Sequence, residues 1–145
     1  MIRTATIIAA LALATPALAD PCEAIPKKGP KPTWIREGVP LTGRVTYLGD
    51  GDGLCFAARP GGSSGWVEVR LADYRAAELH QPGGKEAKAQ LERIAMGKRV
   101  ICTPVRGDYG SIWSWDRVVA VCTVNGRSVG DLMRGAGVVE GGNGR

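Results

Sequence analysis

Hydrophobic and polar residues alternate along the first half of the chain in a pattern that indicates strands. Every second residue of 41–47 is apolar or small, and the residues between them are polar, as in a strand with one buried face. Two apolar runs follow, at 54–58 and 66–71, and the loop at 60–65 between them is rich in glycine and serine. Such a loop favours a hairpin. We therefore predict three consecutive strands.

The period of the pattern then changes from that of a strand to that of a helix. Four apolar side chains within 85–96 recur at i, i+4, i+7 and i+8, and Gly97 follows as a C-terminal cap. Two more apolar runs, at 100–105 and 118–124, predict strands, and 129–134 predicts a short helix.

This order of elements predicts a mainly β (α+β) fold. Three strands, a helix and two strands are the order of a five-stranded OB-type barrel, with one helix between strands three and four and a short C-terminal helix. We place the barrel at 41–139, a Pro- and Lys-rich extended arm at 20–40 and a flexible Gly-rich tail at 140–145. OB barrels bind oligonucleotides or oligosaccharides, and the fold does not choose between them.

The first residues have the pattern of a secretory signal peptide. Arg3 precedes an apolar run at 5–13, and Ala17-Leu18-Ala19 has the small-x-small form of a cleavage site. The alternative, a membrane anchor, needs about 20 apolar residues, and this run is shorter. We predict removal of 1–19, no membrane span afterwards, and a monomer that is periplasmic or secreted.

Four cysteines in an exported chain favour two disulfides, because their wide spacing does not match a zinc site. Three pairings are possible. Cys102 and Cys122 lie in neighbouring predicted strands, which suits a cross-strand bridge. Cys22 would then pair with Cys55 and attach the N-terminal arm to the barrel wall.

The net charge narrows the choice of partner only slightly. The formal net charge is +5 at pH 7, and the predicted signal peptide contributes only Arg3 to it. A mildly basic chain suits a polyanion such as nucleic acid or an acidic polysaccharide, but many secreted proteins are as basic without binding either.

Several short motifs in this order resemble the staphylococcal-nuclease-like (thermonuclease) family, in an exported bacterial form. The similarity spans about 41–139 and rests on spacing, since no single motif is specific. The motifs are Asp50-Gly51-Asp52 after the first strand, Arg70-Leu71 followed eight residues on by Glu78, Gly84-x-Glu86-Ala87 opening the helix, Gly97-Lys98-x-Val100 after it, and Asp116-Arg117 before the last strand.

The resemblance implies a calcium-dependent enzyme that hydrolyses phosphodiester bonds in DNA and RNA. Arg70 and Arg117 match the two phosphate-binding arginines, whose planar forks hold phosphate oxygens. Glu78 matches the carboxylate that deprotonates or positions the attacking water, and Asp52 matches a Ca²⁺ ligand. Each of these residues also has an ordinary interpretation, as a surface ion pair or a turn residue.

The sequence departs from the family pattern at the metal site. Arg75 replaces a second metal-binding aspartate, and calcium needs about six to eight oxygens, several of them anionic. Arg75 is therefore expected to pair with Asp52 and to contact the substrate phosphate itself. Asp73 could replace the missing ligand only with a different loop path, and Gly53 replaces the usual threonine.

The aromatic residues and the histidine complete the candidate set. Trp115 replaces a phosphate-contacting tyrosine and is expected to stack on a base or sugar of the substrate. The alternative is that Trp113 and Trp115 simply cover the end of the barrel. His80 follows Glu78 closely but has no matching role, so we interpret it as an ordinary loop residue.

Two functions follow from these residues. The first is an exported nuclease with an altered calcium site, either metal-independent or weak. The second is a non-catalytic OB module that binds nucleic acid or acidic polysaccharide, which the loss of a metal carboxylate and the basic residues Lys27, Lys28 and Lys31 of the arm favour.

Overall fold

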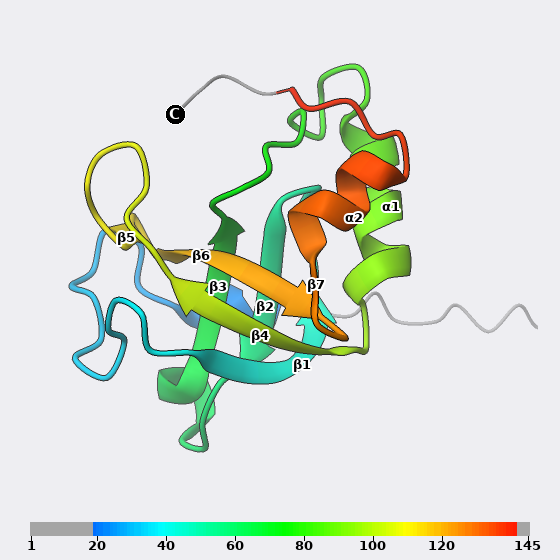
Figure 1. Ribbon diagram of the computed structural model, residues 1–145. Helices are drawn as coiled ribbons and strands as arrows, with labels where there is room; N and C mark the ends of the chain where they lie inside the picture. Colours follow the sequence, from blue (N-terminus) through cyan, green and yellow to red (C-terminus); the bar gives the residue numbers. More distant parts are fainter. Residues whose placement is uncertain (1–18, 142–145) are drawn as a thin grey trace, which may run out of the picture.

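Five strands pair edge to edge and close into a barrel in the computed structural model, which describes residues 19–141 (Figure 1). The barrel order is β3-β2-β1-β4-β6, and a parallel pairing between β6 and β3 closes it. The other neighbours are antiparallel. The five strands are β1 (Leu41–Tyr47), β2 (Gly53–Ala57), β3 (Trp66–Leu71), β4 (Arg99–Pro104) and β6 (Arg117–Val124). This confirms the predicted mainly β, OB-type barrel.

Two short strands extend the sheet beyond the prediction. β5 (Trp113–Ser114) and β7 (Arg127–Ser128) both pair antiparallel with β6. A strand of two residues has no alternation to detect, so the sequence pattern could not reveal either of them. Two short 3-10 helices, η1 (Pro21–Ala24) and η2 (Gly62–Gly65), complete the irregular regions.

Two helices pack beside the barrel (Figure 1), and the sequence predicted both within one residue at each end. They are α1 (Gly84–Ala95) and α2 (Val129–Gly135). The predicted apolar face of α1 is buried, and so are Val129 and Met133 of α2. A Cβ atom on Gly51 would lie 2.6 Å from the Cβ of Ala76 and of Ala87. Glycine at this turn therefore lets α1 and the loop before it approach the barrel.

The arm at 20–40 is packed, so the prediction of an unpacked extended segment was wrong. Asp20 caps η1 by accepting the amide proton of Cys22, and Ile35, only 1% exposed, belongs to the main core. Ile25 packs with Cys22 and Cys55 in a second buried cluster. These apolar residues are too widely spaced to form a period, so the Pro- and Lys-rich composition concealed them.

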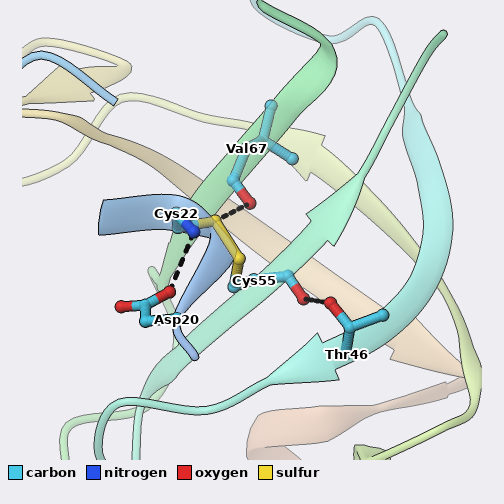
Figure 2. The surroundings of a disulfide bond; sticks show 5 residues. All are labelled: Asp20, Cys22, Thr46, Cys55 and Val67. Atoms are coloured by element: carbon cyan, nitrogen blue, oxygen red, sulfur yellow. Dashed lines mark hydrogen bonds between the residues drawn. A yellow bond between two sulfur atoms is a disulfide. The ribbon is translucent and has the colours of Figure 1, made fainter. Parts of the chain in front are cut away.

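Both predicted disulfides are present. Cys22 is bonded to Cys55, and Cys102 is bonded to Cys122 at facing positions of β4 and β6. Figure 2 shows the first bridge, which attaches η1 to β2. The Cys22 sulfur also lies 3.2 Å from the carbonyl oxygen of Val67, a contact rather than a hydrogen bond, because a disulfide sulfur carries no proton. Two disulfides indicate an oxidising, non-cytoplasmic compartment.

The remaining domain predictions concern the two ends of the chain, which the structure describes only in part. The predicted signal peptide at 1–19 falls almost wholly outside the described residues, as does most of the predicted tail. Within the tail, Glu140 accepts a hydrogen bond from the Arg75 amide and Gly141 donates one to the Arg75 carbonyl. No helix within 19–141 is long and apolar enough to cross a membrane.

Candidate active site

A polar cleft of about 780 Å³ opens on one side of the barrel. Its lining comes from strands β3, β5 and β6, from the turns before β2 and before β6, from the loops after β3 and after β4, and from the N-terminal arm. The sequence analysis predicted six residues to bind substrate, take part in catalysis or bind a metal. All six line this cleft: Asp52, Arg70, Arg75, Glu78, Trp115 and Arg117. Residues from distant parts of the chain are therefore brought together, while their roles stay predictions.

Strand geometry places both phosphate-binding candidates in the cleft. Along β3, Val67, Val69 and Leu71 are buried and the residues between them are half-buried, so Arg70 lies on the face opposite to the core. Arg117 is the first residue of β6, which runs parallel to β3 and pairs with it. The two strands that close the barrel, β3 and β6, thus each supply one arginine, Arg70 and Arg117.

The loop between β3 and α1 carries Glu78. Its side chain is exposed to the cleft, while its backbone is held by Gln81, which donates its amide proton to the Glu78 carbonyl (2.8 Å) and accepts the Glu78 amide proton through its side-chain oxygen (3.1 Å). A Cβ atom on Gly84 would collide with the same Glu78 carbonyl. Glycine at the start of α1 therefore sets where this loop lies.

Asp52 is buried in the wall of the cleft, 8% exposed. Its Oδ2 accepts the amide proton of Ala76 at 3.0 Å, and its own amide donates to Oδ1 of Asp50 at 3.1 Å. Burial, followed by repulsion from the Asp50 carboxylate, raises the pKa of Asp52 to about 6. Asp52 thus connects the turn before β2 to the loop after β3.

Arg75 forms an ion pair with Asp108, not with Asp52 as predicted. The Asp52 carboxylate faces the backbone of the loop and accepts the Ala76 amide proton, whereas the Arg75 side chain reaches the loop after β4. Arg75 and Asp108 have 36% and 55% of their side-chain surface exposed, so solvent weakens the attraction between them. The Arg75–Asp108 pair is therefore a weak, solvent-exposed ion pair at the edge of the cleft.

Asp73 and His80 do not line the cleft. Asp73 accepts a hydrogen bond from the Ser128 hydroxyl at 2.8 Å, and it lies against Gly130 in the first turn of α2. It therefore serves the packing of α2 and does not replace the missing metal ligand. His80 is exposed in the loop, in keeping with its interpretation as an ordinary loop residue.

The two neighbouring tryptophans differ in their surroundings. Trp113 is half-buried and donates its indole N–H to the Gly29 carbonyl at 3.1 Å, so it packs the arm against the barrel. Trp115 is 59% exposed and lines the cleft. The interpretation that both residues cover the barrel end therefore holds for Trp113 and not for Trp115.

Glu68 is a cleft residue that the sequence reasoning missed. It lies two residues before Arg70 on the same face of β3, and it faces Arg117 in the register of β3 and β6. Burial raises the pKa of Glu68 to about 7; Arg117 opposes this rise, and the carboxylate of Asp116 adds to it. The alternation of residues 66–71 would have revealed this residue, since Glu68 and Arg70 are both polar at the same phase.

The carboxylates of the cleft do not fit a calcium site of the family kind. Calcium takes about six to eight oxygen ligands, and Arg75 places a cation where the second aspartate is expected. A metal site needs several ligand atoms close together. Within 19–141, one group of three possible ligands has its ligand atoms within 4.8 Å of one another, and it consists of Asp20, Cys22 and Cys55. Those cysteines form a disulfide, so they offer no thiolate to a metal.

Comparison with known proteins leaves the family resemblance as a prediction. No protein-family model matches the chain, and no curated protein matches it either.

Proposed function

We propose that this protein is an exported nuclease that hydrolyses phosphodiester bonds of DNA or RNA. One observation carries the proposal: Arg70, Glu78 and Arg117 come from separate segments and line the same cleft. Two guanidinium groups can bind a phosphate and offset its charge, and a carboxylate can accept a proton from the attacking water, so this set can support phosphodiester hydrolysis without a metal. The motif spacing of the thermonuclease family supports the same assignment.

In this proposal each residue has a distinct task. Arg70 and Arg117 donate hydrogen bonds to the non-bridging phosphate oxygens and offset the charge that grows in the transition state. Glu78 accepts a proton from a water molecule as the water oxygen bonds to phosphorus. The bond from phosphorus to the leaving oxygen then breaks, that oxygen takes up a proton from solvent water, and Glu78 releases its proton to solvent. Arg75 adds positive charge at the edge of the cleft.

The proposed location follows from the oxidising compartment that two disulfides indicate. The signal-peptide pattern at 1–19 extends this to the periplasm or the medium. Extracellular or periplasmic DNA and RNA are the substrates accessible there.

The test is cleavage of plasmid DNA, single-stranded DNA and RNA by the oxidised protein, with Ca²⁺ and with EDTA. We expect cleavage in both conditions. Glu78→Gln should lower the rate about 10²–10⁴-fold, and Arg70→Lys should lower it nearly as far, because lysine keeps the charge but loses the planar fork. Glu92→Gln, on the exposed face of α1, is the matched control and should not change the rate. A wild-type rate equal to that of Glu78→Gln in every condition would contradict the proposal.

A second function, binding of a polyanion without turnover, is favoured by Arg75. It replaces a metal carboxylate and is held by an exposed ion pair that a phosphate or a uronate could take over. If this is the function, DNA, RNA or an acidic polysaccharide binds at low salt, binding weakens as salt rises, and no product forms with or without Ca²⁺.

A further inference from the structure

Trp115 is held in an unusual place for a tryptophan. It is the first residue of the two-residue turn between β5 and β6, and its φ is +63°. A positive φ in such a turn favours glycine, asparagine or aspartate, because a larger side chain is strained there. A ring that is both strained in its backbone and 59% exposed gains little from packing. Such conflicts between local preference and structure occur at functional sites.

The N-terminal arm supplies a partner for this ring. The ammonium of Lys28 lies 4.6 Å from the centroid of the Trp115 ring, and Lys28 also has a positive φ of +58°. The hydrogen bond from Trp113 to Gly29 and the Cys22–Cys55 bridge attach the arm on either side of this contact. Two strained residues from distant segments are therefore brought face to face.

These residues line a shallow, open hollow of about 440 Å³ that adjoins the cleft. Its lining is Lys28, Gly29, Trp113 and Trp115, and Trp115 lines the cleft as well. Because Arg117 follows Trp115 by two residues, a group stacked on the ring lies next to a phosphate held by that arginine. The hollow thus offers an aromatic face and a cation beside the phosphate-binding residues.

We propose that this hollow binds an unpaired nucleobase of single-stranded DNA or RNA, next to the phosphate that the cleft holds. The inference rests on the proposed function for its ligand class. Every base has an aromatic face that stacks on tryptophan, and a base that takes the place of Lys28 on the ring leaves the ammonium close to the phosphate backbone. Paired bases are already stacked within a duplex, so the site favours single strands.

The test is equilibrium binding to the Glu78→Gln protein, which prevents turnover, measured by fluorescence anisotropy with a labelled single-stranded oligonucleotide. Adding Trp115→Gly should weaken binding roughly tenfold, in line with loss of one base stack. Trp115→Phe keeps an aromatic ring, so its affinity for the oligonucleotide should be close to that of the parent. An oligonucleotide of abasic residues and a duplex should each bind equally to the parent and to the Trp115→Gly protein.

Thermal unfolding separates a binding role from a packing role. Glycine relieves the strain of a positive φ, so Trp115→Gly should unfold at the same temperature as the parent or higher. A lower unfolding temperature would show that the ring packs the fold and would overturn the inference.

Three further outcomes are decisive. Single strands that bind equally well with and without the Trp115 ring overturn the inference but leave the proposed function standing. An acidic polysaccharide whose binding depends on Trp115, while that of DNA does not, identifies a sugar ring as the occupant and overturns the nucleobase assignment. If no nucleic acid binds at low salt, both the inference and the proposed function fail.

Discussion

The carboxyl groups of Glu68 and Asp52 are largely buried, and each lies near other acidic groups. Burial is the first cause of the raised pKa in both, about 7 for Glu68 and about 6 for Asp52. No ion pair within 4.0 Å compensates either group in the described part of the chain. Residues that cost stability in this way are characteristic of sites kept for function.

The raised pKa of Glu68 predicts how stability depends on pH. The folded state binds the proton more tightly than the unfolded state, whose pKa is near the ordinary 4.5. The contribution of Glu68 to the free energy of unfolding should therefore be most favourable below pH 4.5 and be lost as the pH rises through 7. Glu68→Gln removes this loss, and it should stabilise the protein by about 1 kcal/mol at pH 8, after allowance for partial solvent exposure.

Urea unfolding at pH 5 and at pH 8 measures this effect, with Glu92→Gln as the matched control on the exposed face of α1. Relative to the wild type, the Glu68 variant should have a higher free energy of unfolding at pH 8 than at pH 5. The control variant should show no such difference between the two pH values. A Glu68 variant that is less stable than the wild type at pH 8 would mean that the carboxylate is paired and stabilising.

At the scale of elements, the loop that carries Glu78 is positioned by the helix that follows it. Its backbone contacts the first turn of α1 at Gly84, and the loop amide of Ala76 donates to Asp52 of the turn before β2. Gly51 in that turn lies against Ala76 and Ala87. The helix, the loop and the turn therefore form one packed unit at the side of the cleft.

Gly84→Ala tests this unit. The backbone of Gly84 does not have a positive φ, so alanine is locally acceptable, but its Cβ would collide with the Glu78 carbonyl. We expect a loss of about 1–3 kcal/mol in the free energy of unfolding, as in other overpacked sites, and a lower rate of cleavage because Glu78 must shift.

Gly135→Ala in α2 is the matched control. No atom lies within 4 Å of its added Cβ, so the change should be neutral or stabilising by up to about 1 kcal/mol, with an unchanged rate. Equal effects of the two substitutions on stability and rate would rule out the steric role of Gly84.

At the scale of the whole molecule, the two disulfides have separate consequences. The Cys102–Cys122 bridge joins two barrel strands within the core. The Cys22–Cys55 bridge holds the arm, which supplies Asp20, Glu23 and Lys27 to the lining of the cleft. Only the second bridge therefore connects stability to the shape of the site.

Paired alanine substitutions separate these roles. Cys22→Ala with Cys55→Ala, and Cys102→Ala with Cys122→Ala, should each lower the free energy of unfolding by about 3 kcal/mol on the chain-entropy estimate. At a temperature where both variants are folded, only the first pair should weaken binding of single-stranded DNA. Urea unfolding and anisotropy provide the two measurements. Unchanged binding without the Cys22–Cys55 bridge would show that the arm does not shape the site.

The barrel, both helices and both disulfides could be predicted from the sequence alone. Alternation of residues 41–47 and 66–71, the helical period of 85–96 and the cysteine positions are local signals, because burial of one face imposes its period directly on the chain. The cleft candidates were also predictable, since the motif spacing selected residues that the barrel brings together.

Contacts between side chains from distant segments could not be predicted and are known from the folded structure. Arg75 pairs with Asp108 instead of Asp52, the arm packs through isolated apolar residues such as Ile35, and Lys28 lies over Trp115. Each of these contacts joins segments that are far apart in sequence. Hydrophobic periods and short motifs describe neighbouring residues, so they do not predict which distant segments come together. The strain at Trp115 is likewise invisible in the sequence, because a residue's φ depends on the turn into which the strands fold it.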